Sequence, residues 1–320
     1  MVDTVDIAPH VAVVLVTYNS DAVLPGALES LVANGVHLDA VVVADNASRD
    51  DSVKVAQSAA TWLPVRVLQT GRNAGYAAAI NAAVQVLNLD RLDAVFIMNP
   101  DCRLHPDTLA LLAADLRRRA CGIAVPRLLN VDGTLQPSIR RAPTVSRAVA
   151  EAVIGGKKAG RIGRLGELIT DPRAYERPGR AVWATGAAML LSTRLMRELG
   201  PWDESFFLYS EETEYCLRAA DHGYEVWYNP RAVAVHIGGE AQVNPNLAAL
   251  TVVNKVRLYR RRHNAIKGSA FYAATLAGEA LRAMAGRRTS RAAVAGLVRG
   301  SRSRYTIERV VSPRLKPEQT

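Results

Sequence analysis

Residues 94–102 read AVFIMNPDC, an apolar run that ends abruptly in an amide, a proline and a carboxylate. The apolar half has the length and composition of a buried strand. Pro100 lacks a backbone N–H and so favours an abrupt end to that strand. A simple Asn-Pro-Asp turn would account for this ending. The alternative is that Asp101 is a metal-binding carboxylate at the mouth of an α/β sheet.

The same pattern recurs on the N-terminal side of this stretch. Apolar, strand-like runs alternate with helix-like segments. The strand-like runs lie at 11–17, 39–45 and 64–69, and the helix-like segments lie at 22–35, 49–60 and 75–87. Continuous apolar strands separated by helices predict an α/β fold with a mostly parallel sheet flanked by helices. Ligands bind such sheets at the carboxyl ends of the strands. Those ends carry three polar clusters, at Thr17-Tyr18-Asn19, Asp45-Asn46 and Asn99-Pro100-Asp101.

Strand-like and helix-like segments continue beyond Asp101 to about residue 240. Residues 134–180 interrupt them with a stretch rich in Arg, Gly and Pro. Because long loops in compact domains are usually functional or disordered, we expect this stretch to be an excursion over the site.

Composition restricts the class of protein. The 320 residues are enough for one large domain or two modest ones, and 49% are apolar, as in a globular chain with a sizeable core. The three cysteines form no C-x-x-C pair, so the sequence indicates neither a disulfide framework nor a zinc site. The first ten residues have no apolar signal-like run, and we expect a cytoplasmic protein.

The positive charge is concentrated at the C-terminus. Residues 251–320 hold 16 Lys and Arg against three Glu, whereas the remainder of the chain is nearly neutral. The pattern is helical, and Phe271, Tyr272, Leu276, Leu281 and Met284 lie among the basic residues. No run of 18 uncharged residues is present, so we expect a helix in an anionic membrane interface rather than a spanning one. The alternative is a solvated helical face that packs on the rest of the chain.

Seven motifs occur in a familiar order: VVLVTYNS (13–20), VVVADNASRDDS (41–52), GRNAGYAAAINAA (71–83), MNPDC (98–102), ATGAAMLLS (184–192), FFLYSEETEYCLR (206–218) and VHIGG (235–239). Together they resemble family 2 glycosyltransferases of the GT-A fold, most of all the bacterial rhamnosyltransferase-like branch. The resemblance covers roughly residues 11–240. It implies an inverting, metal-dependent transferase that moves a sugar from a nucleotide-diphospho-sugar donor to a hydroxyl of a glycan or polyprenyl-linked acceptor in cell-envelope synthesis.

The resemblance also implies an organisation and a location. A GT-A catalytic domain would span 1–250, with a nucleotide-sugar half at about 1–101 and an acceptor half at about 102–250. Residues 251–320 would form the basic helical extension. A lipid-linked acceptor would place the protein on the inner face of the plasma membrane. dTDP-rhamnose is the first choice of donor, UDP- and GDP-sugars are alternatives, and the oligomeric state stays open, a homo-oligomer included.

Residue roles follow from the matched motifs. Asp45 would accept a hydrogen bond from the pyrimidine ring, although it could equally cap the next turn. Asn99-x-Asp101 stands where the family usually has Asp-x-Asp, so Asp101 would bind Mn²⁺ or Mg²⁺ directly and Asn99 would contact ribose or a metal-bound water. His236 would complete the metal site or contact the diphosphate. The remaining donor-binding residues would be Thr17, Tyr18, Asn19, Asn73 and Gly75.

The acceptor side is implied in the same way. Glu212 stands where the family has its catalytic base, but a Glu replaces the usual Asp there, so the choice between Glu211 and Glu212 stays open. Their helix-start position would also be explained by the helix dipole. Thr185 and Gly186 match an acceptor-side turn. Trp183 could stack on a sugar or pack in the core.

Two other classes of protein fit less well. A nucleotide-dependent oxidoreductase would need a G-x-G-x-x-G fingerprint and a Tyr-x-x-x-Lys pair, which the sequence lacks. A nucleic-acid binding module or non-catalytic membrane module could use the basic tail. Few aromatics lie among the tail's arginines, however, and such a module has no need of Asp101, Glu212 and His236. We therefore expect no nucleic-acid partner.

Overall fold

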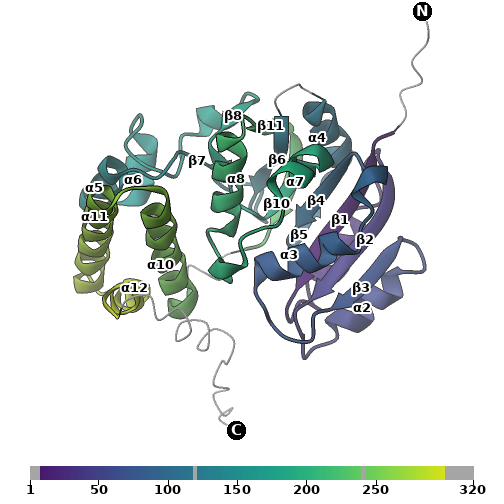
Figure 1. The fold of residues 1–320 in the computed structure, drawn as a ribbon, viewed down its shortest axis with the longest axis horizontal. Coiled ribbons are helices and arrows are strands. Elements are labelled where there is room, and N and C mark those ends of the chain that lie inside the picture. Colours follow the sequence, from purple (N-terminus) through teal and green to yellow (C-terminus); the bar gives the residue numbers. More distant parts are fainter. Residues whose placement is uncertain (1–7, 118–120, 239–242, 300–320) are drawn as a thin grey trace, which may run out of the picture. The chain divides into compact units, whose positions relative to one another are not determined.

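The computed structural model describes residues 8–117, 121–238 and 243–299 and divides them into two compact units (Figure 1). The first unit draws on Met1–Ala142, Leu168–Ser205 and Glu211–Gly238. The second draws on Pro143–Glu167, Phe206–Ser210 and Gly239–Thr320. The second unit therefore takes an internal segment, 143–167, in addition to the C-terminal residues.

The first unit is built on a mixed sheet. Its strands are β1 (His10–Thr17), β2 (His37–Asp45), β3 (Val65–Gln69), β4 (Ala94–Met98), β5 (Cys102–Leu104), β6 (Cys121–Leu129), β7 (Ile139–Arg140), β8 (Gly179–Ala181), β9 (Trp183–Ala184), β10 (Ala188–Ser192) and β11 (Glu225–His236). In the described part of the chain the main sheet runs β3-β2-β1-β4-β10-β6-β11-β5, with β8 on β11, and β7 pairs with β9 separately. Strands β3, β2, β1 and β4 are parallel, and β10 then enters antiparallel to β4.

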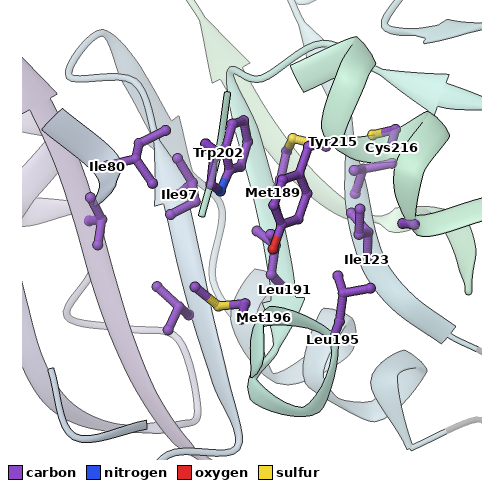
Figure 2. Close-up of a cluster of buried hydrophobic side chains, with 14 of the residues drawn as sticks. Ile80, Ile97, Ile123, Met189, Leu191, Leu195, Met196, Trp202, Tyr215 and Cys216 are labelled. Atoms are coloured by element: carbon purple, nitrogen blue, oxygen red, sulfur yellow. The ribbon is translucent and has the colours of Figure 1, made fainter. Parts of the chain in front are cut away.

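Helices cover both faces of this sheet. They are α1 (Leu24–Glu29), α2 (Ser52–Ala59), α3 (Tyr76–Gln85), α4 (Thr108–Leu116), α7 (Thr193–Leu199) and α8 (Glu211–Asp221), and short 3₁₀ turns lie at Leu89–Arg91, Pro172–Tyr175 and Glu204–Phe206. One core forms between the sheet and α3, α7 and α8 and includes Ile80, Met196 and Tyr215 (Figure 2). The other forms against α1, α2 and α4. The predicted helix-flanked, mostly parallel sheet is thus confirmed.

The second unit is helical. It contains α5 (Val145–Ile154), α6 (Gly156–Arg161), α10 (Pro245–Arg262), α11 (Ala265–Met284) and α12 (Arg288–Val298) (Figure 1). Side chains fix three of the helix starts: Thr144 accepts from Arg147 N–H, Asn244 from Asn246 N–H, and Asn264 from Lys267 N–H. Residues 134–180, which were expected to form an excursion over the site, include the helices α5 and α6. The Thr144 cap sets the start of α5, and packing within the unit stabilises the helices.

A small apolar core holds this unit together and corrects one expectation. Phe271 is 1% exposed and stacks on Tyr259 with ring centroids 3.9 Å apart, so it is a core residue and not part of a membrane-facing surface. Tyr272 and Leu276 pack against the same core. Leu281 and Met284 are exposed, as the interfacial interpretation requires. Residues 300–320 of the predicted tail lie outside the described residues.

A partly buried ion cluster joins α10 to the internal segment of the second unit. Lys255 Nζ lies 2.7 Å from Glu167 Oε2 and 3.4 Å from Glu151 Oε2. Burial alone would lower the pKa of Lys255, but the two carboxylates outweigh it and raise that pKa. The lysine therefore stays charged and neutralises carboxylates that would otherwise be costly inside the unit.

We expect Lys255→Met to lower the free energy of unfolding by about 3 kcal/mol, the lower end of the cost of breaking a buried pair. The reason is that Glu151 and Glu167 would be left inside without their cation. Urea unfolding followed by circular dichroism measures the effect, and Lys267→Met, at an exposed position on α11, should shift the midpoint little. Equal midpoints for the two variants would contradict this role.

Candidate active site

The first two strands end in a hydrogen-bonded polar cluster. The β1–β2 register sets Thr17 opposite Asp45, and Thr17 Oγ1 donates to Asp45 Oδ1 at 2.9 Å. Ser48 donates to the same carboxylate through its hydroxyl (2.5 Å) and its backbone N–H (2.9 Å). Asp45 is 1% exposed, so this network anchors the turn that follows β2. Base recognition by Asp45 stays a prediction, and Ser48 is a partner that the sequence alone did not single out.

A second group of contacts ties this turn to the start of α3. Asn46 Nδ2 donates to Gly75 O at 3.1 Å, and Gly75 N–H donates to Asn73 Oδ1 at 3.2 Å. Gly75 has φ +98°, which disfavours any residue with a side chain. Asn19, also at positive φ, accepts from Arg49 N–H. The predicted donor-binding residues of β1, β2 and the 73–75 turn therefore lie along one edge of the sheet, with Tyr18 beside them.

The candidate metal ligands meet through a strand register. β5 and β11 pair antiparallel with His236 opposite Cys102, which brings the preceding residue, Asp101, beside the imidazole. Asp101 Oδ1 lies 3.4 Å from His236 Nε2, and Asp101 Oδ2 accepts from Gly238 N–H at 2.8 Å. Burial opposes ionisation of Asp101, but the His236 side chain, when its Nε2 is protonated, and the Gly238 N–H outweigh it and lower the pKa of the Asp101 carboxyl.

These two groups fit a divalent cation. Adjacent oxygen or nitrogen ligands of a six-coordinate ion lie about 3 Å apart, and the Asp101–His236 separation is close to that spacing. Cys102 is within reach of the same point, but its thiol donates to Ala187 O and burial raises its pKa well above the usual range. A neutral thiol is a poor ligand for Mn²⁺ or Mg²⁺. The donor set is therefore one carboxylate and one imidazole, with the remaining positions left for ligand and water oxygens.

Tyr76 lies between the candidate metal ligands and the acceptor-side residues. Its hydroxyl is 2.9 Å from Asn99 Oδ1 and 3.1 Å from Gly186 O. Burial, followed by the charge of Glu211, raises its pKa well above the usual range, so it remains a hydrogen-bond donor. The sequence motif singled out Asn73 and Gly75 but not Tyr76, whose partners Asn99 and Gly186 lie 23 and 110 residues away in the chain.

The two candidate bases open α8. Phe207, Tyr209 and Ser210 all have positive φ just before the helix, a costly conformation for residues with side chains. Glu211 is only 3% exposed, whereas Glu212 is less buried. A Cβ added to Gly186 would lie 3.3 Å from Glu212 Cβ, so the glycine allows Glu212 to pack closely against this turn, and its acceptor-side role stays a prediction. The choice between the two carboxylates stays open.

The other predicted acceptor-side residues, Thr185 and Trp183, make contacts with the segment around residues 138–141. Thr185 N–H donates to Ser138 O at 3.1 Å. Trp183 is 8% exposed, its indole N–H donates to Arg141 O, and Arg140 lies over its ring. These contacts favour the core alternative for Trp183, and its predicted role at the acceptor side stays untested.

A helix-flanked sheet that gathers polar side chains at its strand ends, beside a carboxylate–imidazole pair, is the arrangement of a GT-A transferase. The chain belongs to glycosyl transferase family 2. The model named Glycosyl transferase family 2 matches residues 12–163, and the model named Glycosyl transferase family group 2 matches residues 166–261. The chain is a glycosyltransferase, in agreement with the resemblance of its motifs.

Two curated relatives support this membership. The chain is 32% identical over 247 residues to an N-acetylglucosaminyl-diphospho-decaprenol L-rhamnosyltransferase of Mycobacterium tuberculosis, with 72% of this chain and 76% of the relative covered. It is 24% identical to the low-salt glycan biosynthesis hexosyltransferase Agl10 of Haloferax volcanii, over 54% of this chain and 52% of that protein.

Solved structures share the fold at low identity. GalNAc-T7, crystallised with UDP, GalNAc and Mn²⁺, superposes with a TM-score of 0.59 at 16% identity and covers 79% of this chain and 48% of its own. The mannosyltransferase PcManGT of Pyrobaculum calidifontis, in complex with GDP-Man and Mn²⁺, gives a TM-score of 0.56 at 18% identity over 96% of this chain and 86% of its own.

We expect Tyr76→Phe to reduce kcat/KM for sugar transfer roughly tenfold, the effect of losing about one buried hydrogen bond. The aromatic packing would survive, but the Asn99 amide would lose its donor and turn more freely. Steady-state kinetics check this, with Tyr224→Phe as the control because that hydroxyl contacts the exposed Glu198 instead. Unchanged kinetics in Tyr76→Phe would contradict the orienting role.

Proposed function

We propose that this protein transfers a sugar, with rhamnose from dTDP-rhamnose as the first choice, to a hydroxyl of a lipid-linked acceptor in cell-envelope synthesis. The observation that carries the proposal is that Tyr76 bridges Asn99, two residues before Asp101, and Gly186, which lies against Glu212. These contacts connect the residues that would hold the leaving group with the residue that would act as base. The relative named as an L-rhamnosyltransferase supports the choice of sugar and acceptor. A UDP- or GDP-sugar is the alternative donor.

The donor would lie across the strand ends of the first unit. The Thr17–Asp45 cluster would bind the base, and the turn from Asn73 to Gly75 would approach the ribose and phosphates through backbone atoms. Asn99, oriented by Tyr76, would contact ribose or a bound water. Asp101 and His236 would hold Mn²⁺ or Mg²⁺ at the diphosphate. When bound, the ion offsets the negative charge that develops on the leaving diphosphate.

Inversion needs a base on the acceptor side of the sugar. Glu212, or alternatively Glu211, would take the proton of the acceptor hydroxyl as its oxygen attacks the anomeric carbon opposite the diphosphate. The absence of a side chain at Gly186 lets Glu212 lie close to the turn that the resemblance assigns to the acceptor side.

The second unit supports peripheral contact with an anionic membrane. Its described residues hold sixteen Lys and Arg against three Glu. All three carboxylates are partly or fully buried and paired, Glu151 and Glu167 with Lys255 and Glu279 with Arg282. Within the described residues no helix is both long enough and apolar enough to cross a bilayer. Contact through one face is therefore the mode that the unit's charge distribution favours.

Exposed apolar side chains accompany these cations. Along residues 149–165 the exposed apolar side chains are Val149, Val153, Ile154, Ile162 and Leu165. The exposed cationic side chains there are Lys157, Lys158, Arg161 and Arg164. Arg282 Nη1 donates to Glu151 O at 3.2 Å, which brings the end of α11, with exposed Leu281 and Met284, beside the same segment. We refer to this set as the 149–165 surface.

The proposed activity is tested by incubating the protein with dTDP-rhamnose, UDP-sugars and GDP-sugars, Mn²⁺ or Mg²⁺, and a polyprenyl-diphospho-GlcNAc acceptor. We expect transfer from dTDP-rhamnose that EDTA abolishes and that Asp101→Asn reduces at saturating metal. Thermal shift with each donor gives an independent readout, because a bound ligand stabilises the folded state. Full activity in EDTA would refute the metal dependence. Thermal stabilisation by another nucleotide-sugar alone would refute dTDP-rhamnose as the donor.

We expect Glu212→Gln to lower kcat by about 10²–10⁴-fold while donor and metal binding persist. Gln is nearly isosteric and still accepts a hydrogen bond, but it cannot take a proton at neutral pH. Single-turnover transfer at saturating donor measures the effect, with Glu211→Gln as the matched variant. A dead Glu211→Gln beside an active Glu212→Gln would move the base by one residue.

We expect Lys157→Glu/Lys158→Glu to weaken binding to phosphatidylglycerol-rich vesicles at least tenfold at low salt, because each basic residue near an anionic surface contributes about 1 kcal/mol. The difference should shrink as salt screens the charges. Vesicle co-sedimentation measures it, and Arg66→Glu/Arg91→Glu, which makes the same charge change on the first unit, is the control. Equal binding by both double variants would contradict the 149–165 surface.

A further inference from the structure

A chain of hydrogen bonds with a fixed direction reaches His236 from the loop after β6. The chain begins at Asp132, a carboxylate whose pKa is lowered by the Thr134 hydroxyl and which can therefore only accept. Thr134 Oγ1 donates to Asp132 Oδ1 at 2.6 Å. Having given its proton there, Thr134 Oγ1 must accept from Asn130, which donates through Nδ2 at 2.9 Å.

The direction then passes through two amides. Because Asn130 uses its NH₂ group toward Thr134, its Oδ1 faces Gln136 and accepts from Gln136 Nε2 at 3.0 Å. The same Nε2 donates to the carbonyl of His236 at 3.2 Å. Gln136 therefore presents its oxygen, Oε1, to His236 Nδ1 at 2.7 Å. A carbonyl oxygen has no proton to give, so Nδ1 carries the hydrogen.

The contacts on the opposite side of the ring are compatible with the same tautomer. The Tyr76 hydroxyl lies 2.9 Å from Asn99 Oδ1 and 3.1 Å from Gly186 O, and a proton given to Asn99 Oδ1 turns Asn99 Nδ2 toward His236 Nε2 at 3.4 Å. An N–H group facing Nε2 requires a lone pair there. Gln136 and Asn99 thus favour a proton on Nδ1 and a free lone pair on Nε2, whereas the Asp101 carboxylate favours the other tautomer.

We propose that Gln136 is a positioning residue that holds His236 in the Nδ1–H tautomer, with the Nε2 lone pair directed toward the point it shares with Asp101. The inference rests on the proposed function in that a divalent cation would occupy this point. The alternative tautomer has a clear driving force, since Asp101 Oδ1, 3.4 Å from Nε2, would accept a proton placed there. Gln136 competes with that carboxylate and keeps the ligand atom available.

The first test reads the tautomer without any metal or activity. Two-bond ¹H–¹⁵N spectra of the histidine-labelled protein are recorded at a pH alkaline enough that the ring carries one proton, with His236→Ala to assign the signal. We expect Nδ1–H in the wild type, Nε2–H in Gln136→Leu, and Nδ1–H again in Gln136→Glu, which restores an acceptor opposite Nδ1. Nε2–H in the wild type, or an unchanged tautomer in Gln136→Leu, overturns the proposal.

The second test measures Mn²⁺ affinity by electron paramagnetic resonance of the free ion in the presence of dTDP. We expect Gln136→Leu to weaken Mn²⁺ binding 10–100-fold, Gln136→Glu to restore most of it, and Gln57→Leu on α2 to have no effect. Unchanged affinity in Gln136→Leu, when His236→Ala weakens binding, overturns the positioning role. Unchanged affinity in His236→Ala overturns the metal assignment of the proposed function instead, and the spectra distinguish the two failures.

Discussion

The pairing of β11 with β5 is the constraint on which the candidate site depends. Its register sets His236 opposite Cys102 and thereby brings the imidazole to Asp101, which lies 135 positions earlier in the chain. β11 is also held by β6 over most of its length, so the position of His236 is fixed by a strand with partners on both sides. A shift of one residue would turn every side chain of β11 to the opposite face of the sheet. The candidate metal ligands are therefore positioned by the backbone pairing of these strands, which includes the hydrogen bond from Ile237 N–H to Asp101 O at 3.2 Å.

The side chains that hydrogen-bond around Asp101 and His236 are uncharged. Tyr76, Asn99 and Gln136 contribute no formal charge, yet between them they face both nitrogens of the His236 ring. Uncharged donors and acceptors can fix a ring's orientation without competing for a cation, as a second carboxylate would. The replacement of the usual Asp-x-Asp by Asn99-x-Asp101 fits this logic. An amide at position 99 can receive a hydrogen bond from Tyr76 and donate toward the imidazole at once, which a carboxylate cannot do.

The strands, their parallel order and the strand-end clusters could be predicted because buried strands and turn residues leave local signals, as at AVFIMNPDC. The contacts of Gln136 could not, since they depend on a loop meeting a strand that is 100 residues away in sequence. Tyr76 was missed for the same reason, as its partner Gly186 comes from another part of the sheet. In the described part of the tail the helices were predicted correctly, but the burial of Phe271 was not. The cationic helix α10 packs on α11 through Tyr259 and Phe271. Composition cannot reveal that a basic segment has an apolar core of its own.

The internal charges of the second unit determine the character of its surface. A helical unit with so many cations would normally scatter acidic residues over its exterior, where they screen repulsion at little cost. Here Glu151 and Glu167 are instead placed against Lys255, where desolvation makes them expensive unless that lysine is present. These carboxylates therefore do not screen the repulsion between cations on the exterior of the unit. The 149–165 surface consists of cations and exposed apolar side chains. The self-repulsion of such a surface is relieved when it lies against negative charge, and its apolar side chains gain by leaving water. Both contributions favour the same partner, an anionic lipid surface, where a lipid-linked acceptor would also be found.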